Sequence, residues 1–275
     1  MVMEFGDKLI DIPVWSQPVL QNKNAVITGG TSGIGYEMAK TFLGAECSKI
    51  LITSRNQERL DKAISKLKSV YPDKRESILG AILDLTKVDS LKQAFSQIEK
   101  QFGADTIDIW VNNAGIYQGT RFGTVTESQW DELMEINLKS QFFLSQCIAN
   151  YMIKKGVKGN ILNMCSSSSY RPSVDPYMIS KLGMSGLTLG MAKKLIPFGI
   201  VVNGIAPGPT FTPMLHKTEG DSIIHGGIPA GRYIMPQEVA NLAVFLTSSM
   251  GRMIVGDVVK ITGGSAVVTY DDVKY

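Results

Sequence analysis

Short apolar runs that alternate with helical periods restrict this chain to a few architectures. The runs are rich in β-branched residues and end in glycine or polar residues, as buried strands do. We predict seven strands, at residues 24–30, 49–54, 77–85, 107–115, 159–166, 200–208 and 257–264. Each gap between them is long enough for a helix.

Apolar residues spaced by three and four positions predict helices in these gaps, for example around Leu60, Ile64 and Leu67. Thr126, followed three residues later by Gln129, is typical of a capping box and predicts the start of a long helix that reaches Met152. Strand, helix and strand in repetition predict an α/β fold, a doubly wound parallel sheet with helices on both faces. Because no composition break divides the strands into two sets, we predict one domain.

Charge and composition exclude several classes of protein. The net charge is only +3, from 28 basic and 25 acidic residues, and no basic tract exceeds two lysines, which argues against a nucleic-acid partner. No apolar run approaches the roughly 18 residues of a membrane span, and the first residues lack the pattern of a signal peptide. Three cysteines, Cys47, Cys147 and Cys165, form no C-x-x-C pair and favour free thiols. We therefore expect a soluble, cytoplasmic protein.

The first predicted strand runs into the glycine-rich segment TGGTSGIG, which contains Gly29, Gly33 and Gly35. Glycine lets backbone N–H groups approach a phosphate at the positive end of the following helix. The spacing is G-x-x-x-G-x-G rather than G-x-G-x-x-G. The segment thus predicts a phosphate-binding loop, and the alternative is a plain tight turn.

Five motifs occur in the order and approximate spacing that are typical of one known protein family. They are TGGTSGIG, the pair Asp84 and Leu85, NNAG at 112–115, YMISK at 177–181, and the pair Pro207 and Gly208. In these motifs the chain resembles the short-chain dehydrogenases/reductases, over residues 23–264. The resemblance implies a single Rossmann-like catalytic domain over that range, a substrate lid at 209–232, an N-terminal extension at 1–22 and a C-terminal tail at 265–275. It also implies a nicotinamide dinucleotide, hydride exchange between a carbonyl and an alcohol, and a homotetramer or homodimer.

Tyr177 and Lys181 lie four residues apart on a predicted helix, whose start is indicated by Asp175 as N-cap and Pro176 as first residue. Side chains at this spacing share one face. A nearby ammonium favours an ionised phenol, so we predict that the pKa of Tyr177 is lowered. The resemblance implies that Tyr177 transfers the proton and that Lys181 also holds the nicotinamide ribose. The alternative is a chance surface pair.

A hydroxyl is expected after the fifth strand, where it would donate to the substrate oxygen. Ser166 fits best by position, but four serines stand in a row and the segment up to Tyr177 is short for the family, so Ser167 and Ser168 remain alternatives. Asn137 matches the family asparagine that holds a water beside the lysine; its alternative is a local backbone bond within a helix. Cys165 is expected to be a buried structural thiol.

The end of the second strand indicates which cofactor is preferred. Ser54 stands where NAD-preferring relatives have Asp, and Arg55 follows it. An arginine pairs with a 2′-phosphate, which a carboxylate would repel. We therefore predict NADP(H) over NAD(H); the alternative is that Arg55 is a solvated helix cap. The resemblance implies cofactor contacts at Gly29, Thr31, Ser32, Gly33, Ile34, Gly35, Ser54, Arg55, Asp84, Leu85, Asn112, Ala114, Gly115, Tyr177, Lys181, Pro207, Gly208 and Thr212. Asn112, Ala114 and Gly115 have a second interpretation, as stabilisers of the sheet centre.

Residues 215–231 lack a firm period and contain both histidines, His216 and His225, which we expect on the surface of a mobile lid. Their spacing predicts no metal site. The substrate is a small carbonyl or alcohol compound; Tyr117, Arg121, Tyr170 and Arg171 follow strands and are candidates for its pocket, and arginines there would suit an anion.

Two further points stay open at this stage. Gly183, Gly186 and Gly190 predict close packing on one helix face, either within the chain or against a second subunit. For the N-terminal extension, only packing of Trp15 is expected. The alternative to an enzyme is an inactive dinucleotide-binding regulatory or structural subunit.

Overall fold

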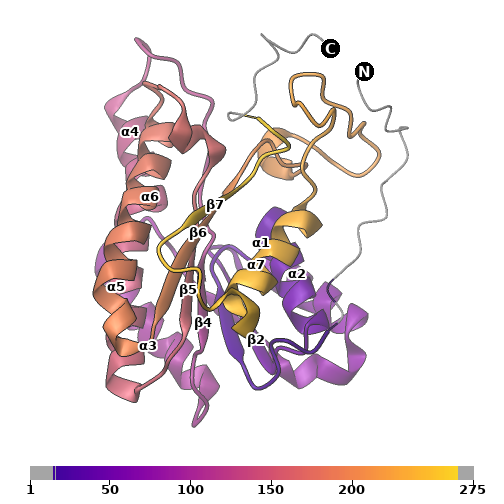
Figure 1. The fold of residues 1–275 in the computed structure, drawn as a ribbon, viewed down its shortest axis with the longest axis vertical. Coiled ribbons are helices and arrows are strands. Elements are labelled where there is room, and N and C mark those ends of the chain that lie inside the picture. Colours follow the sequence, from indigo (N-terminus) through magenta and orange to yellow (C-terminus); the bar gives the residue numbers. More distant parts are fainter. Residues whose placement is uncertain (1–14, 16, 266–275) are drawn as a thin grey trace.

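The computed structural model describes Trp15 and residues 17–265. Its centre is a parallel sheet of seven strands in the order β3-β2-β1-β4-β5-β6-β7 (Figure 1). The strands are β1 (Asn24–Ile27), β2 (Lys49–Ser54), β3 (Ile78–Ile82), β4 (Ile109–Asn112), β5 (Asn160–Met164), β6 (Val201–Pro207) and β7 (Val258–Ile261). The order reverses between β1 and β4, which creates a crevice at the carboxyl ends of the strands. The predicted doubly wound, Rossmann-like fold is confirmed.

Helices cover both faces of the sheet (Figure 1). One layer contains α1 (Gly33–Gly44), α2 (Gln57–Val70) and α7 (Pro236–Thr247), and the other contains α3 (Leu91–Phe102), α4 (Glu127–Met134), α5 (Ser140–Lys155) and α6 (Pro176–Leu195). Successive strand residues serve the two layers alternately, since Ala25 and Ile27 pack into one core and Val26 into the other. A strand buried on both faces needs a continuous apolar run, which explains the sequence pattern.

The predicted helix from Thr126 to Met152 is present but divided. Its capping box forms as expected, because the Thr126 Oγ1 accepts from the Gln129 N–H and the Gln129 side chain accepts from the Thr126 N–H. Between α4 and α5 the chain makes a wider π-helical segment, Glu135–Lys139, which contains Asn137. Periodicity alone did not predict this segment, which is the kind of bulge often found at functional sites.

Several predicted strands are longer than those observed. Residues 107–115, for example, form a strand only from Ile109 to Asn112. The residues beyond it leave the sheet and line a cavity at its carboxyl edge. The second strand, Lys49–Ser54, has the predicted bounds. The N-terminus of α6 is also as predicted, with Pro176 in the first turn and the Asp175 carboxylate accepting from the Tyr177 N–H at 2.7 Å.

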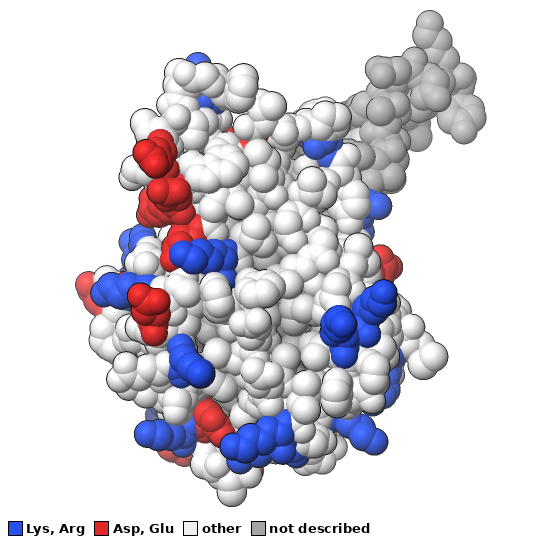
Figure 2. Space-filling view, turned by 90° about the vertical axis from the view of Figure 1, so that its left-hand side faces the viewer, with Lys and Arg blue, Asp and Glu red and all other residues white. Residues whose placement is uncertain are grey.

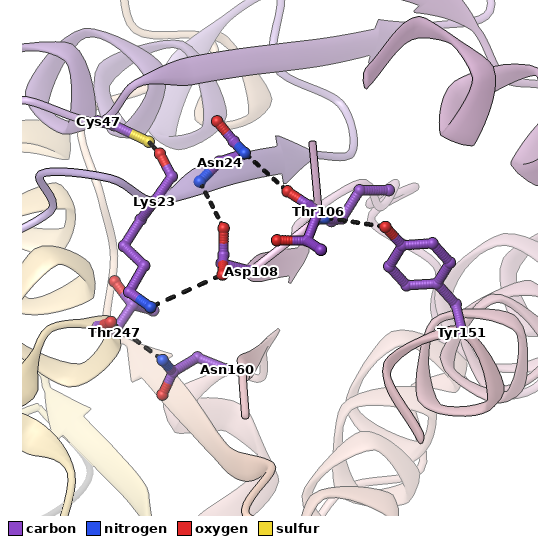
Figure 3. A network of polar contacts seen from close by, with 9 residues as sticks. Lys23, Asn24, Cys47, Thr106, Asp108, Tyr151, Asn160 and Thr247 are labelled. Carbon is purple, nitrogen blue, oxygen red and sulfur yellow. Dashed lines mark hydrogen bonds and ion pairs between the residues drawn. The ribbon is translucent and has the colours of Figure 1, made fainter. Parts of the chain in front are cut away.

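A polar network joins β1 and β4 at the amino ends of the strands, opposite the cavity (Figure 3). The Asp108 carboxylate accepts from the Asn24 N–H at 3.0 Å and lies 3.7 Å from the Lys23 ammonium. The Asn24 side chain donates to the Thr106 carbonyl at 2.8 Å. These bonds satisfy polar groups that the sheet ladder leaves unpaired, so this edge serves stability.

The described part of the N-terminal extension packs on the first layer. Leu20 is fully buried there, and Trp15 packs against the same core, where its backbone N–H donates to the Asn241 side-chain oxygen at 3.2 Å. Of the three glycines on α6, Gly183 lies against Leu138 within the chain, whereas Gly186 and Gly190 face open space. None of the described helices combines the length and apolar character needed to span a bilayer.

Candidate active site

The carboxyl edge of the sheet contains a cavity of about 700 Å³. Residues that follow β1 to β6 line it, as expected for a crevice at a switch in strand order. The residues proposed from the sequence that line it are Gly29, Thr31, Ser32, Gly33, Ile34, Gly35, Ser54, Arg55, Asp84, Leu85, Ala114, Gly115, Ser166, Tyr177, Lys181, Pro207, Gly208 and Thr212.

Close contacts around the glycine-rich segment leave no room for a larger side chain. A Cβ on Gly35 would lie 2.4 Å from the Gly29 carbonyl oxygen and from the Asn113 side-chain nitrogen. The Asn113 amide donates to the carbonyls of Thr28 and Gly29 at 2.8 and 3.1 Å. Asn113 therefore shapes the loop, and the sequence analysis missed it although it stands within NNAG. The loop precedes the N-terminus of α1, which suits a phosphate.

The end of β2 presents two arginines to the cavity, Arg55 and Arg59. Arg59, which the sequence analysis missed, lies in the first turn of α2, and its short distance in sequence from Arg55 and the end of β2 was the available signal. Among the described residues, the one acidic side chain that lines the cavity is Asp84. Burial acts to raise the pKa of Asp84, but hydrogen bonds from Thr86 and the nearby Lys87 outweigh burial and lower it. The glycine loop and the two guanidinium groups thus fit a dinucleotide with an additional phosphate.

Within α6, Lys181 is buried and Tyr177 is half-buried, and burial shifts their pKa values in opposite directions. It raises the pKa of Tyr177 to about 12, against a hydrogen bond with the Ser166 side chain that lowers it. Burial lowers the pKa of Lys181 to about 8. The Lys181 Nζ donates to the Met164 carbonyl at 2.8 Å and lies 5.7 Å from the centre of the Tyr177 ring. The predicted lowering of the tyrosine pKa is therefore wrong in this structure, because burial outweighs the ammonium.

Among the serines, Ser166 is the one whose side chain bonds Tyr177. It caps the short helical turn Ser167–Tyr170 by accepting from the Ser168 N–H at 3.2 Å. Ser167 and Ser168 also line the cavity. Cys165 is buried, as expected, and burial raises the pKa of its thiol.

The two proposed asparagines lie beneath the cavity rather than on its surface. Asn137 accepts from the Ile116 N–H at 2.8 Å and donates to the Ile116 carbonyl at 2.9 Å. A Cβ on Gly115 would lie 3.1 Å from the Asn137 oxygen and 3.5 Å from the Lys181 Nζ, so these two groups flank Gly115.

Asn112 is a correction to the proposed set of cofactor contacts. Its amide donates to Ser145 and Asn163 at 2.8 Å, and its oxygen accepts from the Trp110 indole at 2.7 Å. The side chain does not line the cavity. It is buried between the strands and α5 and fulfils the alternative interpretation, a stabiliser of the sheet centre.

Of the four residues proposed for the substrate pocket, two line the cavity and two do not. Tyr117 and Arg171 line the cavity, and the Tyr117 ring packs edge-on against Tyr177 at 5.2 Å. Arg121 does not line it, and neither does Tyr170, whose hydroxyl bonds the Val258 carbonyl.

The lid residues differ from expectation in one respect. His225 lines the cavity together with Tyr233, Met214 and Leu215, whereas His216 does not. His225 therefore forms part of the cavity wall, whereas both histidines were expected on the surface of the lid. The described residues contain no cluster of side chains that could hold a metal ion.

The comparisons with known proteins agree with this geometry. The sequence model of the short chain dehydrogenase family matches residues 23–222. The chain belongs to this family. It is 36% identical to the 3alpha-hydroxysteroid dehydrogenase of Mediterraneibacter gnavus, over 90% of this chain and 98% of that enzyme. It is 34% identical to the gluconate 5-dehydrogenase of Gluconobacter oxydans, over 90% and 96%.

Solved structures show the same relationship. The gluconate 5-dehydrogenase of Burkholderia cenocepacia, in complex with NADP and tartrate, superposes with a TM-score of 0.81 at 30% identity and covers 92% of this chain and 99% of its own. The family member described here is therefore an oxidoreductase of hydroxyl and carbonyl groups, and the family's cofactors are nicotinamide dinucleotides.

Proposed function

We propose that this protein is an NADP(H)-dependent oxidoreductase that interconverts a ketone or aldehyde and an alcohol, with Tyr177 as the general acid or base. The observation that carries the proposal is the half-buried Tyr177, hydrogen-bonded to Ser166 and close to Lys181, in the cavity that begins at the glycine loop. A bound nicotinamide supplies or accepts the hydride. An inactive regulatory subunit is the alternative.

The raised pKa of Tyr177 keeps its phenol neutral at physiological pH, as a proton donor must be. In the direction of reduction, the phenol gives its proton to the substrate oxygen as the carbonyl carbon gains a hydride. Ser166 donates a hydrogen bond to the same oxygen and stabilises its developing charge. The Lys181 ammonium lies close enough to stabilise the phenolate that remains. Asn137, bonded to the backbone of Ile116, is proposed to order the polar groups beside Lys181.

The preference for NADP(H) rests on the charges at the end of β2. Arg55 and Arg59 line the cavity there, and Ser54 leaves the position free of a carboxylate. Two guanidinium groups favour a 2′-phosphate by charge-assisted hydrogen bonds. We expect the double variant with Arg55→Ala and Arg59→Ala to raise the KM for NADPH at least tenfold while the KM for NADH changes little. A wild-type enzyme that is more efficient with NADH would contradict the preference.

The proposed reaction is tested with Tyr177→Phe. Stopped-flow absorbance at 340 nm with NADPH and a panel of ketones should show turnover in the wild type and a loss of at least a thousandfold in the variant. NADPH binding, followed by fluorescence, should persist in both. A wild-type protein that binds NADPH and oxidises none of it over the whole panel would favour the regulatory subunit.

We also propose that the chain assembles into homodimers or homotetramers. The face over α5 and α6 has a broad central area without charged side chains (Figure 2). Phe142, Phe143, Leu182 and Leu189, which belong to these two helices, are each 40–58% exposed, and exposed apolar side chains in this number favour association. Phe143→Glu should lower the mass measured by light scattering.

The three free thiols support the predicted cytoplasmic location.

The relatives' names do not agree on a carbon skeleton, since one is a steroid dehydrogenase and others act on gluconate. The substrate of this chain must therefore be argued from its own cavity.

A further inference from the structure

Arg171 is a charged side chain of the cavity that the proposed reaction does not use. It follows the turn that begins after Ser166, and it lines the same cavity as Ser166 and Tyr177. Its guanidinium donates to the Ser265 hydroxyl at 2.6 Å. The neighbouring Tyr170 donates to the Val258 carbonyl at 3.3 Å. Two bonds to the β7 side of the molecule thus hold this segment, so the guanidinium is oriented in advance of binding.

Within the described part of the chain, Arg171 forms no ion pair. No carboxylate of the described residues lies within 4.0 Å of it. Asp84, which is the acidic residue in the described lining, follows β3, four strands away from β5 and therefore roughly 19 Å distant. Its carboxylate lies 3.6 Å from Lys87. A positive group without a counterion near the reacting hydroxyls favours an anionic ligand.

The lid supplies a second hydrogen-bond donor. The His225 Nδ1 accepts from the Gly227 N–H at 3.1 Å, which leaves Nε2 as the ring nitrogen that can donate a hydrogen bond. The ring packs edge-on against Tyr233 at 4.6 Å, and both residues line the cavity. Arg171 and His225 thus offer donors from two different walls, while an acid that would repel an anion is absent from this part of the described lining.

We propose that the substrate carries a carboxylate and that Arg171 is the residue that selects it. This inference rests on the proposed function, since the carbonyl of the substrate has to reach Ser166 and Tyr177. The substrate class is then an oxo acid or hydroxy acid. The planar guanidinium pairs with both oxygens of a carboxylate, a geometry that lysine does not reproduce.

The test compares two ketones that differ in one group. 5-Keto-D-gluconate carries a carboxylate where L-sorbose carries CH2OH. With NADPH, the wild type should prefer the acid by about 10- to 100-fold in kcat/KM, as expected for charge-assisted hydrogen bonds. Arg171→Gln should remove most of this ratio, mainly through the KM for the acid, and Arg171→Lys should restore only part of it. Arg121→Gln, an exposed arginine outside the cavity, is the matched control and should behave as the wild type.

A binding measurement keeps the inference testable if neither skeleton is a good substrate. Tartrate should bind the wild-type protein with NADP present, by calorimetry, and bind Arg171→Gln at least tenfold more weakly. If Arg171→Gln lowers kcat/KM equally for both ketones, or if the two proteins bind tartrate with equal affinity, the role proposed for Arg171 is wrong. The oxidoreductase proposal is not affected by either result. Failure of the oxidoreductase proposal would be recognised separately, as absence of any Tyr177-dependent turnover.

Discussion

Replacing Lys181 by methionine should make the protein more stable at neutral pH while it abolishes turnover. The side chain is buried, and burial lowers its pKa from 10.5 to about 8. That difference corresponds to a cost of about 3 kcal/mol for holding the ammonium in the folded state. Methionine has a similar length and no charge, so it avoids this cost.

The gain is partly offset by a lost hydrogen bond. The Lys181 Nζ donates to the Met164 carbonyl at 2.8 Å, and such a bond contributes about 1 kcal/mol. The net expectation is a free energy of unfolding about 1–2 kcal/mol higher at pH 7, or a Tm higher by roughly 2–4 °C.

The pH dependence provides a second measurement. Below pH 8 the lysine is protonated in both states, so the folded wild type carries the full cost. Between about pH 8 and 10.5 the unfolded chain binds more protons than the folded one, so the stability of the wild type rises with pH. The difference in free energy of unfolding between Lys181→Met and the wild type therefore decreases over this range.

The assay is urea unfolding followed by tryptophan fluorescence at fixed protein concentration, from pH 7 to 10.5. Lys194→Met is the control, because Lys194 is exposed in the last turn of the same helix, where its charge favours the helix dipole. That variant should lose about 0.3–1 kcal/mol. A Lys181→Met protein that is less stable than the wild type at pH 7, or an advantage that does not vary with pH, would refute the reasoning.

Three further outcomes are expected. Gly35→Ala should abolish NADPH binding in a fluorescence titration, because its Cβ would lie 2.4 Å from the Gly29 carbonyl, whereas Gly226→Ala, with open space around it, should bind as the wild type. Asp108→Ala should lower the free energy of unfolding by about 1–3 kcal/mol and leave the KM for NADPH unchanged, since its bond to the Asn24 N–H lies at the opposite edge of the sheet. Cys47, whose pKa burial raises to about 12, should resist iodoacetamide at pH 8 until urea unfolds the protein, and early modification would contradict its burial.

Local patterns predicted most of the fold because each rests on neighbouring residues. The β-branched run at Lys49–Ser54 determined its strand without reference to the rest of the chain. The Asp175 cap and the Thr126 capping box were visible for the same reason, since their partners lie two and three residues away.

Other features depend on contacts between distant segments. The π-helical segment at Glu135–Lys139 accompanies bonds from Asn137 to Ile116 and from the Gln141 amide to the Ala114 carbonyl, and periodicity does not record such contacts. His225 lines the cavity because the chain turns back on itself between Ile224 and Arg232 and packs the ring on Tyr233. A segment without a period gave no indication of that packing.

The pKa of Tyr177 was mispredicted for a related physical reason. Helical spacing predicted that the ammonium of Lys181 lies near the phenol, but it did not reveal that Lys181 is buried, that Tyr177 is half-buried, or that Nζ turns to the Met164 carbonyl. Burial penalises charge on either group, so it shifts the two pKa values apart.

This separation has a consequence for turnover. With pKa values of about 8 and about 12, the Lys181 ammonium is a stronger acid than the Tyr177 phenol. A phenolate left after proton donation can therefore regain its proton at the expense of Lys181, and the reducing enzyme needs a charged lysine. We expect kcat/KM for ketone reduction by NADPH to fall as pH rises through about 8. A profile between pH 6 and 10 that stays level up to pH 10 would show that the lysine is not the group whose charge limits the reaction.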